Sequence, residues 1–481
     1  MIRFLSKHKY WVFICLLFLV LRLPSLFEPY WYGDEGIYLT LGQAIRRGLT
    51  LYSQIHDNKP PTLYYLASIY PTMFGFRFLL FLTMIPSIIL FYKLSLLFVK
   101  EKFAKFSTFI FVILTSIPLF EGNISNAENF MLLPTIAAFL IFLKFKKNKL
   151  KLFLSGFLLG LAFTIKIPVF IEFGFLFVWL FLDNLKNLKK NFFKIFAKLF
   201  IFGIGFLLPI ILWGLYFALD NTFPQFLNSA LLQNFSYLSS WATGTHTASA
   251  SSGGLITRLI ILIISWVIFY FLLLKKKLSS LHTFLLCWLA ATIFGALLST
   301  RPYPHYLIQL LPPLCIAFFY FQKKTIFHNL VNIISLLLVL AIILNYKFYY
   351  YSTFKYYKNF YSFLPQASYY TYFSPNTLLY KNISDYINKN TNPNDYIFVW
   401  GDEPYIYAMT NRLPPGRYTV AYHIVDFNGY DETIESIKSN TPKFIVYFPM
   451  NNRPFSKLDD ILNRYYFLDQ KIQSVLIFQK R

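Results

Sequence analysis

Long apolar runs follow one another from the N-terminus to about residue 347, and they limit the fold more than any other feature of this sequence. Each run is close to the ~20 residues that an α-helix needs to cross a hydrocarbon core of about 30 Å. The chain is 56% hydrophobic and 14% charged, whereas soluble domains carry about 25% charged residues. The pattern predicts an α-helical polytopic membrane protein with about eleven transmembrane helices: 10–27, 77–99, 103–120, 129–143, 152–167, 168–182, 199–219, 256–274, 281–299, 306–321 and 329–346. The fifth and sixth runs meet at "TIKIPVF", and a pair of full crossings and a re-entrant pair both fit there.

The placement of the basic residues predicts the orientation. The net charge is +24, but the lysines gather in short gaps between apolar runs, as in "KFKKNKLK" (144–151) and "KKK" (275–277). Cytoplasmic loops of membrane proteins carry this excess, so it indicates loops beside membrane lipids and no nucleic-acid partner. We expect a multi-pass protein of the plasma membrane, with a cytoplasmic N-terminus and extracytoplasmic segments at 28–75 and after residue 347.

Composition divides the chain into two predicted domains. Residues 1–347 form the transmembrane domain, with a long first outer loop at 28–75. Residues 348–481 are more polar and are expected to fold as an extracytoplasmic α/β domain. Helical spacing runs from Leu379 to Ile387, and strands are expected at 396–400, 443–448 and 474–478.

The first outer loop carries the first acidic pair, in "GDEGIY" (33–38). The stretch that follows predicts an amphipathic helix on the membrane surface, with one apolar face and Gly48 near its end. Asp34 either caps this helix, since Asp favours helix N-termini, or acts as a general base in a partly desolvated setting. Both interpretations stay open on local sequence.

Cations from distant parts of the chain reach the same predicted face. Lys59 follows in the first loop, Lys166 ends the fifth run, and "RPYPHY" (301–306) supplies Arg301, His305 and Tyr306. Each has a simpler reading as a snorkelling or interfacial side chain. Together they suit a lipid phosphate that carries a sugar. The cations would hold the phosphate, Asp34 would take a proton from an acceptor hydroxyl, and one direct displacement of the phosphate by that hydroxyl would invert the anomeric centre.

Three further segments carry polar residues that face outward in this topology. "EGNISNAEN" (121–129) supplies Glu128 and Asn126 as acceptor or second-loop candidates, although a plain polar loop also fits. "WATGTHTASASSGG" (241–254) is either a lid or a flexible linker. "GDEPYIY" (401–407) repeats the acidic pair, and there Asp402 is interpreted as a helix cap. The first pair, Asp34 and Glu35, is therefore the predicted catalytic pair, with Asp34 favoured.

The order of these motifs resembles the GT-C superfamily of membrane glycosyltransferases, in the branch of dolichyl-phosphate-mannose-protein mannosyltransferase-like and aminoarabinose transferases. The resemblance rests on "DEGIY", "DNKPPT", "FLLGLAFTIKIP" and "RPYPHYLIQLLPP" and covers nearly the whole chain. It implies Asp34 as base, Lys59 on the lipid phosphate, and His305 and Tyr306 at the outer face. Aminoarabinose transferases have an acid before that lysine, where this chain has Asn58. A divalent cation is therefore neither required nor excluded.

The resemblance also implies the partners, namely a polyprenyl-phosphate-linked sugar and an extracytoplasmic glycan, lipid or protein acceptor. The sugar, the acceptor and the lipid length stay open. Two other functions fit a polytopic basic chain. A transporter or lipid flippase would place ionisable groups near the bilayer midplane in paired halves. A non-catalytic assembly or adhesion protein would use the tail as its working part.

Overall fold

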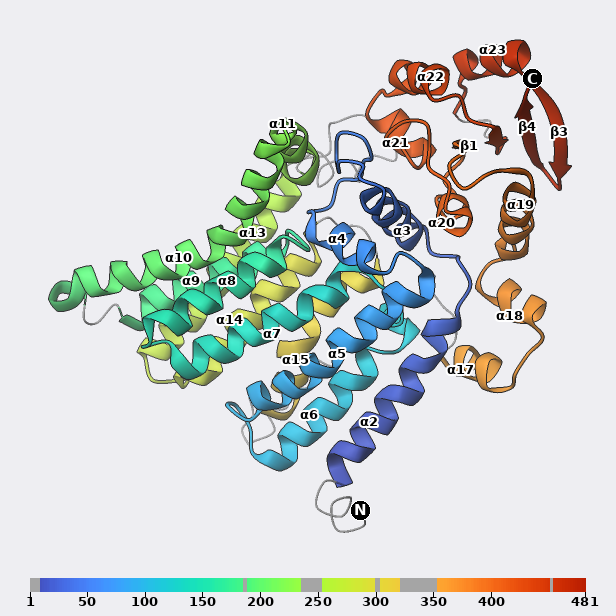
Figure 1. Cartoon of the computed structure of the whole chain (residues 1–481). Coiled ribbons are helices and arrows are strands. Elements are labelled where there is room, and N and C mark those ends of the chain that lie inside the picture. Colours follow the sequence, from blue (N-terminus) through green and yellow to red (C-terminus); the bar gives the residue numbers. More distant parts are fainter. Residues whose placement is uncertain (1–8, 185–187, 235–252, 299–302, 321–352, 450–452) are drawn as a thin grey trace. The chain divides into compact units, whose positions relative to one another are not determined.

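A computed structural model describes residues 9–184, 188–234, 253–298, 303–320, 353–449 and 453–481 (Figure 1). Ten of the predicted apolar runs coincide with helical segments, and the eleventh, 329–346, lies outside the described residues. These segments are α2 (Lys9–Arg22) with η1 (Leu23–Phe27), α5 (Met73–Ser95), α6 (Glu101–Leu114), α7 (Ala127–Phe145), α8 (Lys149–Phe163), α9 (Val169–Asn184), α10 (Leu188–Leu219), α13 (Gly253–Leu274), α14 (Ser280–Ala296), and η5 (Pro304–Leu310) with α15 (Leu311–Tyr320).

Within the described residues, five helical segments are long and apolar enough to cross a membrane: Lys9–Phe27, Met73–Ser95, Ala127–Phe145, Asn191–Leu219 and Leu255–Leu274. Helices α6, α8, α9 and α14 are shorter, with 14, 15, 16 and 17 residues. The chain is thus a mostly helical, multi-pass membrane protein, and the total of eleven crossings stays a prediction.

The chain divides into two compact units. The first contains Met1–Ser25, Leu80–Tyr216 and Phe235–Tyr357, and the second contains Leu26–Leu79, Phe217–Asn234 and Lys358–Arg481. The first outer loop therefore groups with the C-terminal segment, although the two are far apart in sequence. Each unit is described by itself below.

Helix α3 (Gly33–Arg46) begins the first outer loop and is the link between these distant segments in the second unit. Three of its side chains donate hydrogen bonds to backbone carbonyls near α20 (Tyr405–Thr410). Thr40 Oγ1 lies 3.2 Å from Pro404 O, Gln43 Nε2 lies 2.9 Å from Ala408 O, and Arg47, at the helix end, reaches Asn411 O at 2.6 Å. We call this row of three donors the α3 clamp.

The clamp corrects one expectation from the sequence. An amphipathic helix on a membrane surface buries one face, but α3 is buried at every position from Glu35 to Ala44. The apolar face packs on α4 (Thr62–Ile69), and the polar face is covered because its side chains bond to the tail. Gly36 permits this approach, since a Cβ there would lie 2.9 Å from Tyr405 N.

The tail folds around a four-stranded sheet with the order β1-β2-β4-β3. Strands β1 (Ile397–Trp400) and β2 (Phe444–Tyr447) are parallel, with Phe398 opposite Ile445. Strand β4 (Val475–Lys480) pairs antiparallel with β2 and with β3 (Tyr466–Ile472). The strands expected at 396–400, 443–448 and 474–478 are therefore present, and β3 is an addition that the sequence reading missed.

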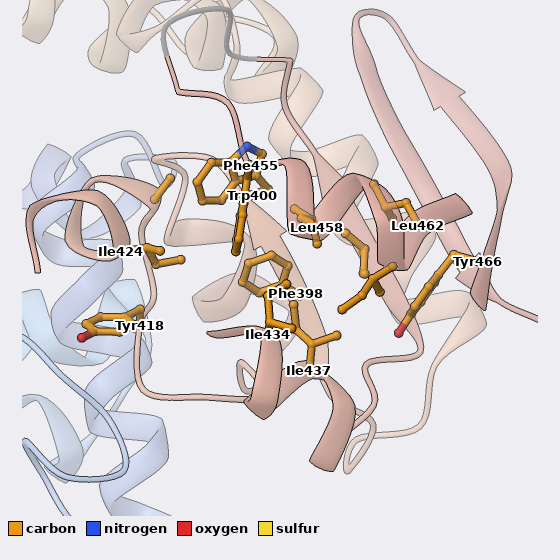
Figure 2. Packing of buried hydrophobic residues seen from close by; sticks show 13 residues of the cluster. Phe398, Trp400, Tyr418, Ile424, Ile434, Ile437, Phe455, Leu458, Leu462 and Tyr466 are labelled. Carbon is orange, nitrogen blue, oxygen red and sulfur yellow. The ribbon is translucent and has the colours of Figure 1, made fainter. Parts of the chain in front are cut away.

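Alternating side chains of β1 divide the core between the two faces of the sheet. Phe398 and Trp400 pack with α21 (Ala421–Asp426), α22 (Tyr430–Ser439) and α23 (Ser456–Tyr465), as Figure 2 shows. Ile397 and Val399 pack on the other face with α20 and α19 (Thr377–Asn390). Strand β1 is thus buried on both sides, which explains why its sequence is an uninterrupted apolar run.

Candidate functional site

Asp34 and Lys59 meet in the second unit. The Lys59 Nζ atom lies 3.3 Å from Asp34 Oδ2, and the two side chains are 17% and 32% exposed. The Tyr38 hydroxyl, one turn along α3, donates to the same carboxylate oxygen at 2.9 Å. The Lys59 ammonium also lies over the Tyr38 ring, 4.9 Å from its centroid. Both charged side chains are therefore partly exposed to water.

The structure shows which residue stands at the N-cap position of α3 and what the Asp34 side chain contacts. Tyr32 is the N-cap residue of α3 and makes no side-chain capping bond. The Asp34 carboxylate lies in the first turn and is used by Lys59 and Tyr38 instead. Asp34 is therefore not the N-cap residue, although its carboxylate lies in the first turn of α3, where an acid favours the helix dipole.

Asp57 holds Lys59 from the buried side. Its carboxylate is 2% exposed and lies 3.7 Å from Lys59 Nζ. The Tyr64 hydroxyl donates to it at 2.7 Å. Burial alone would raise the pKa of Asp57, but the Lys59 charge, the neighbouring His423 and the Tyr64 hydrogen bond together lower that pKa. Asp57 is thus a fixed anion that keeps the ammonium in place.

The tail contributes directly to this cluster through His423 on α21. His423 Nε2 lies 3.7 Å from Asp57 Oδ1, and the His423 ring lies 5.5 Å from the ring of His56. Both imidazoles are buried. Burial lowers the pKa of each, to about 3 for His56, so both are neutral at physiological pH. We call Asp34, Tyr38, Lys59, Asp57 and His423 the first-loop cluster.

Glu35, the other half of the predicted pair, has a different environment. Its side chain is 0% exposed and receives two hydrogen bonds from Arg77, from Nε at 2.8 Å and from Nη2 at 2.5 Å. Arg77 Nη1 also pairs with Glu28 at 2.8 Å, and Trp31 Nε1 donates to Glu28 at 2.8 Å. Glu35 is therefore a member of a buried ion cluster that fixes the start of α3.

A second polar cluster forms in the first unit. Lys166 Nζ pairs with Glu128 at 2.8 Å, and His305 Nδ1 lies 2.5 Å from Glu121 Oε2. His305 Nε2 also lies 4.0 Å from Glu128. Lys166 stands over the Tyr306 ring at 5.1 Å. The structure thus brings together residues predicted from three separate stretches, and we call them the second-loop cluster.

Two neighbours complete the second-loop cluster. Asn126 Nδ2 donates to Glu121 Oε2 at 3.4 Å, which connects the remaining predicted residue. Glu172 on α9 accepts from Trp288 at 3.0 Å and from Gln309 at 2.8 Å, and so ties the 3₁₀ segment that carries His305 to the helices.

The single pocket expected from the sequence would combine both clusters, and that expectation stays a prediction. Arg301 and most of the 241–254 segment lie outside the described residues. Where the structure describes the chain, no group of three or more His, Cys, Asp or Glu side chains could hold a metal ion.

The second acidic motif differs from its interpretation in one respect. Helix α20 begins at Tyr405 with Pro404 as its N-cap, so Asp402 does not cap it. Asp402 Oδ1 instead accepts the backbone N–H of Tyr422 at 3.0 Å in the first turn of α21, and Asp402 Oδ2 pairs with Arg453 at 2.6 Å. Burial and the neighbouring Asp402 raise the pKa of Glu403 to about 7.

Sequence reasoning missed the roles of His56 and His423 and saw in Asp57 only a neighbour of Lys59. Asp57 and His56 precede the "NKPP" stretch, and that proximity was the available signal. Nothing local to His423 indicates that α21 approaches the first loop, since the contact depends on the docking of the tail.

Comparison with known proteins identifies the fold. Neither a protein-family model nor a curated protein sequence matches this chain. The crystal structure of ArnT from Cupriavidus metallidurans bound to undecaprenyl phosphate matches with a TM-score of 0.62 at 11% identity, over 98% of each chain. Its apo state matches with a TM-score of 0.58 at 11% identity, also over 98% of each chain. The archaeal oligosaccharyltransferase AglB from Archaeoglobus fulgidus gives 0.47 at 14%, over 92% of this chain and 70% of AglB. The chain therefore has an ArnT-like fold.

Proposed function

We propose that this chain, with its ArnT-like fold, is an integral-membrane glycosyltransferase that moves a sugar from a polyprenyl-phosphate donor to an extracytoplasmic acceptor. The observation that carries the proposal is the Asp34–Lys59 pair at 3.3 Å, partly open to water. The ArnT structure with this fold holds undecaprenyl phosphate, a ligand of the class that Lys59 would bind.

The reaction is a single displacement at the anomeric carbon. The acceptor hydroxyl oxygen forms the new bond as the bond from the anomeric carbon to the phosphate oxygen breaks, and the configuration inverts. Asp34 takes the hydroxyl proton. The lipid phosphate leaves with the electron pair, and the Lys59 ammonium stabilises the charge that develops on it.

The geometry of the first-loop cluster explains how donor binding would free Asp34 from Lys59 and let it act as the base. Without donor, Lys59 lies between two carboxylates, 3.3 Å from Asp34 and 3.7 Å from the buried Asp57. A donor phosphate competes with Asp34 for the ammonium, while Asp57 keeps Lys59 in position. Asp34 then loses the cation that lowers its basicity. Glu35 has no such part in the reaction, because Arg77 holds it buried.

The second-loop cluster supplies the remaining proposed roles. Lys166, His305 and Tyr306 would contact the donor phosphate or its sugar. Arg301 is proposed for the same role, although it lies outside the described residues. Glu128 and Asn126 would face the acceptor. The proposed topology places residues 1–347 in the plasma membrane with a cytoplasmic N-terminus, and residues 348–481 outside the cell.

Two substitutions in the first-loop cluster test the proposal. The protein is reconstituted in liposomes with a panel of undecaprenyl-phosphate-linked sugars and envelope acceptors, and sugar transfer is followed. Asp34→Asn should lower kcat by roughly 10²–10⁴-fold, the usual range for a general base. Donor affinity should hold or increase in this variant, because the carboxylate that competes for Lys59 has lost its charge.

Lys59→Gln should instead weaken donor binding. Loss of a hydrogen bond to a charged group costs about 1.5–3 kcal/mol, or roughly 10–100-fold in affinity, which undecaprenyl phosphate binding would report. Lys381 and Asp385 form an exposed i,i+4 pair on α19, so Asp385→Asn and Lys381→Gln are chemically matched controls. Full turnover by a folded Asp34→Asn variant would refute the role of Asp34 as general base. Uptake of ions or free sugar by the liposomes would favour the alternative that the protein is a transporter.

A further inference from the structure

The turn between α17 (Thr353–Tyr361) and α18 (Gln366–Phe373) exposes large apolar side chains outside the candidate membrane spans. Phe363 is 88% exposed, and its neighbours Tyr361 and Leu364 are 39% and 37% exposed. Soluble surfaces carry such residues singly, but a continuous apolar patch usually marks a contact with a partner or a membrane. We call residues 361–364 the aromatic turn.

The backbone of the turn is arranged to present Phe363. Its φ is 48°, in the left-handed region that few residues other than glycine adopt. A bulky side chain in this conformation is unfavourable, and in water an exposed phenyl ring brings no compensating contact. A residue held in this way is a reason to look for a function.

Ring contacts join the turn to the ends of two membrane-crossing segments. Phe360, in the last turn of α17, stacks on Phe27 with ring centroids 6.0 Å apart, and Phe27 is the last residue of the span Lys9–Phe27. Phe27 also contacts Phe74 at 6.1 Å, and Phe74 stacks on Phe78 at 5.8 Å. Phe74 and Phe78 start the exposed apolar stripe of α5, which is itself a candidate span.

The connection between the aromatic turn and the exposed stripe of α5 indicates that the bilayer covers the turn. The exposed stripe of a membrane-crossing helix faces lipid, and the ring contacts connect the aromatic turn to Phe74 and Phe78, where that stripe begins. Trp and Tyr are enriched where a membrane meets water, and Tyr361 belongs to the turn. Lys358 on α17 is exposed beside them, where an ammonium can reach lipid phosphates. We infer that the aromatic turn inserts into the headgroup region of the bilayer and anchors the second unit to it.

The inference goes beyond sugar transfer and can be tested without it. The full chain with Cys15→Ser, which removes the one exposed cysteine among those described, receives Phe363→Cys or Leu468→Cys and an environment-sensitive fluorophore. Leu468 on β3 is the matched control, because it is also apolar and 52% exposed in the second unit. Each protein is reconstituted in phosphatidylcholine vesicles with and without brominated acyl chains.

The probe at 363 should emit at shorter wavelength than the probe at 468, and brominated lipid should quench it several-fold more. Ser362→Cys gives a second reading of the same turn that leaves Phe363 in place. Equal, weak quenching at all three positions would overturn the inference. So would a probe at 363 that is shielded from water, unquenched by brominated lipid and released on protein dilution, since a second copy would then cover the turn. Loss of transferase activity in an Asp34 variant has no bearing on either outcome.

Discussion

The buried ion cluster around Arg77 allows a sharp test of how the start of α3 is held. Arg77 is 1% exposed and Glu28 and Glu35 are 0% exposed, so none of the three charges is screened by water. The substitution Arg77→Met keeps most of the side-chain volume and removes the cation. It leaves two carboxylates buried beside each other, with Trp31 Nε1 as a remaining donor to Glu28.

The expected loss follows from the cost of an unpaired buried charge. Removing one partner of a buried pair destabilises a protein by about 3–5 kcal/mol. Whole domains are stable by about 5–15 kcal/mol, so Arg77→Met should take away a large part of the stability. The triple variant Arg77→Met, Glu28→Met, Glu35→Met should recover most of the loss, because replacement of a complete buried ion cluster by apolar side chains of similar volume is often nearly neutral.

The assay is the free energy of unfolding of the purified protein in one detergent, with the same variants compared for sugar transfer. Lys381→Met removes a cation from an exposed pair and should leave the unfolding curve unchanged. If Arg77→Met lowers the free energy of unfolding by less than about 1 kcal/mol, the range of exposed pairs, the claim that Arg77 neutralises two buried carboxylates is refuted. A triple variant as unstable as the single one would refute the explanation by orphaned carboxylates.

Three further predictions use other contacts. Gly36→Ala should destabilise by about 1–3 kcal/mol, since its Cβ would lie 2.9 Å from Tyr405 N, whereas Gly33→Ala on the same helix meets nothing within 4 Å and should be tolerated in thermal unfolding. The unfolded chain protonates His56 below about pH 6.5, but the folded chain does so only near pH 3. The free energy of unfolding should therefore fall by about 1.4 kcal/mol per pH unit as the pH is lowered from about 6.5 to about 3. His56→Gln should make this dependence on pH less steep in denaturant titrations. Glu172→Leu removes the acceptor of the Trp288 indole N–H and of one Gln309 N–H, which should cost about 1–3 kcal/mol for each, seen as a lower Tm.

Local patterns predicted the helices well because length and hydropathy dominate in a membrane. The run at 77–99 corresponds to Met73–Ser95, and the run at 256–274 to Gly253–Leu274. Strand β1 was also readable, since both of its faces are buried. Strand β3 was not, because most of its side chains are exposed and its polar residues break the apolar alternation.

The sequence predicted most residues of the candidate site, but not the side chains from distant segments that contact them. Asp34 and Lys59 are in the same loop, and their pairing follows a motif. Glu35 was predicted with Asp34 as one catalytic pair, but adjacent residues of a helix face different directions. The Arg77 that pairs with Glu35 lies on another helix, so the sequence near Glu35 does not reveal it. His423 reaches Asp57 only after the tail docks on α3, and no periodicity in the sequence reports that docking.

The α3 clamp bears on how this protein can diverge. All three of its acceptors, near Pro404, Ala408 and Asn411, are main-chain carbonyls, which every amino acid provides. Side chains of the tail can therefore drift from one species to the next without loosening the helix that carries Asp34. Chimeras that exchange the tail should tolerate many point differences and fail when an insertion shifts the carbonyl spacing.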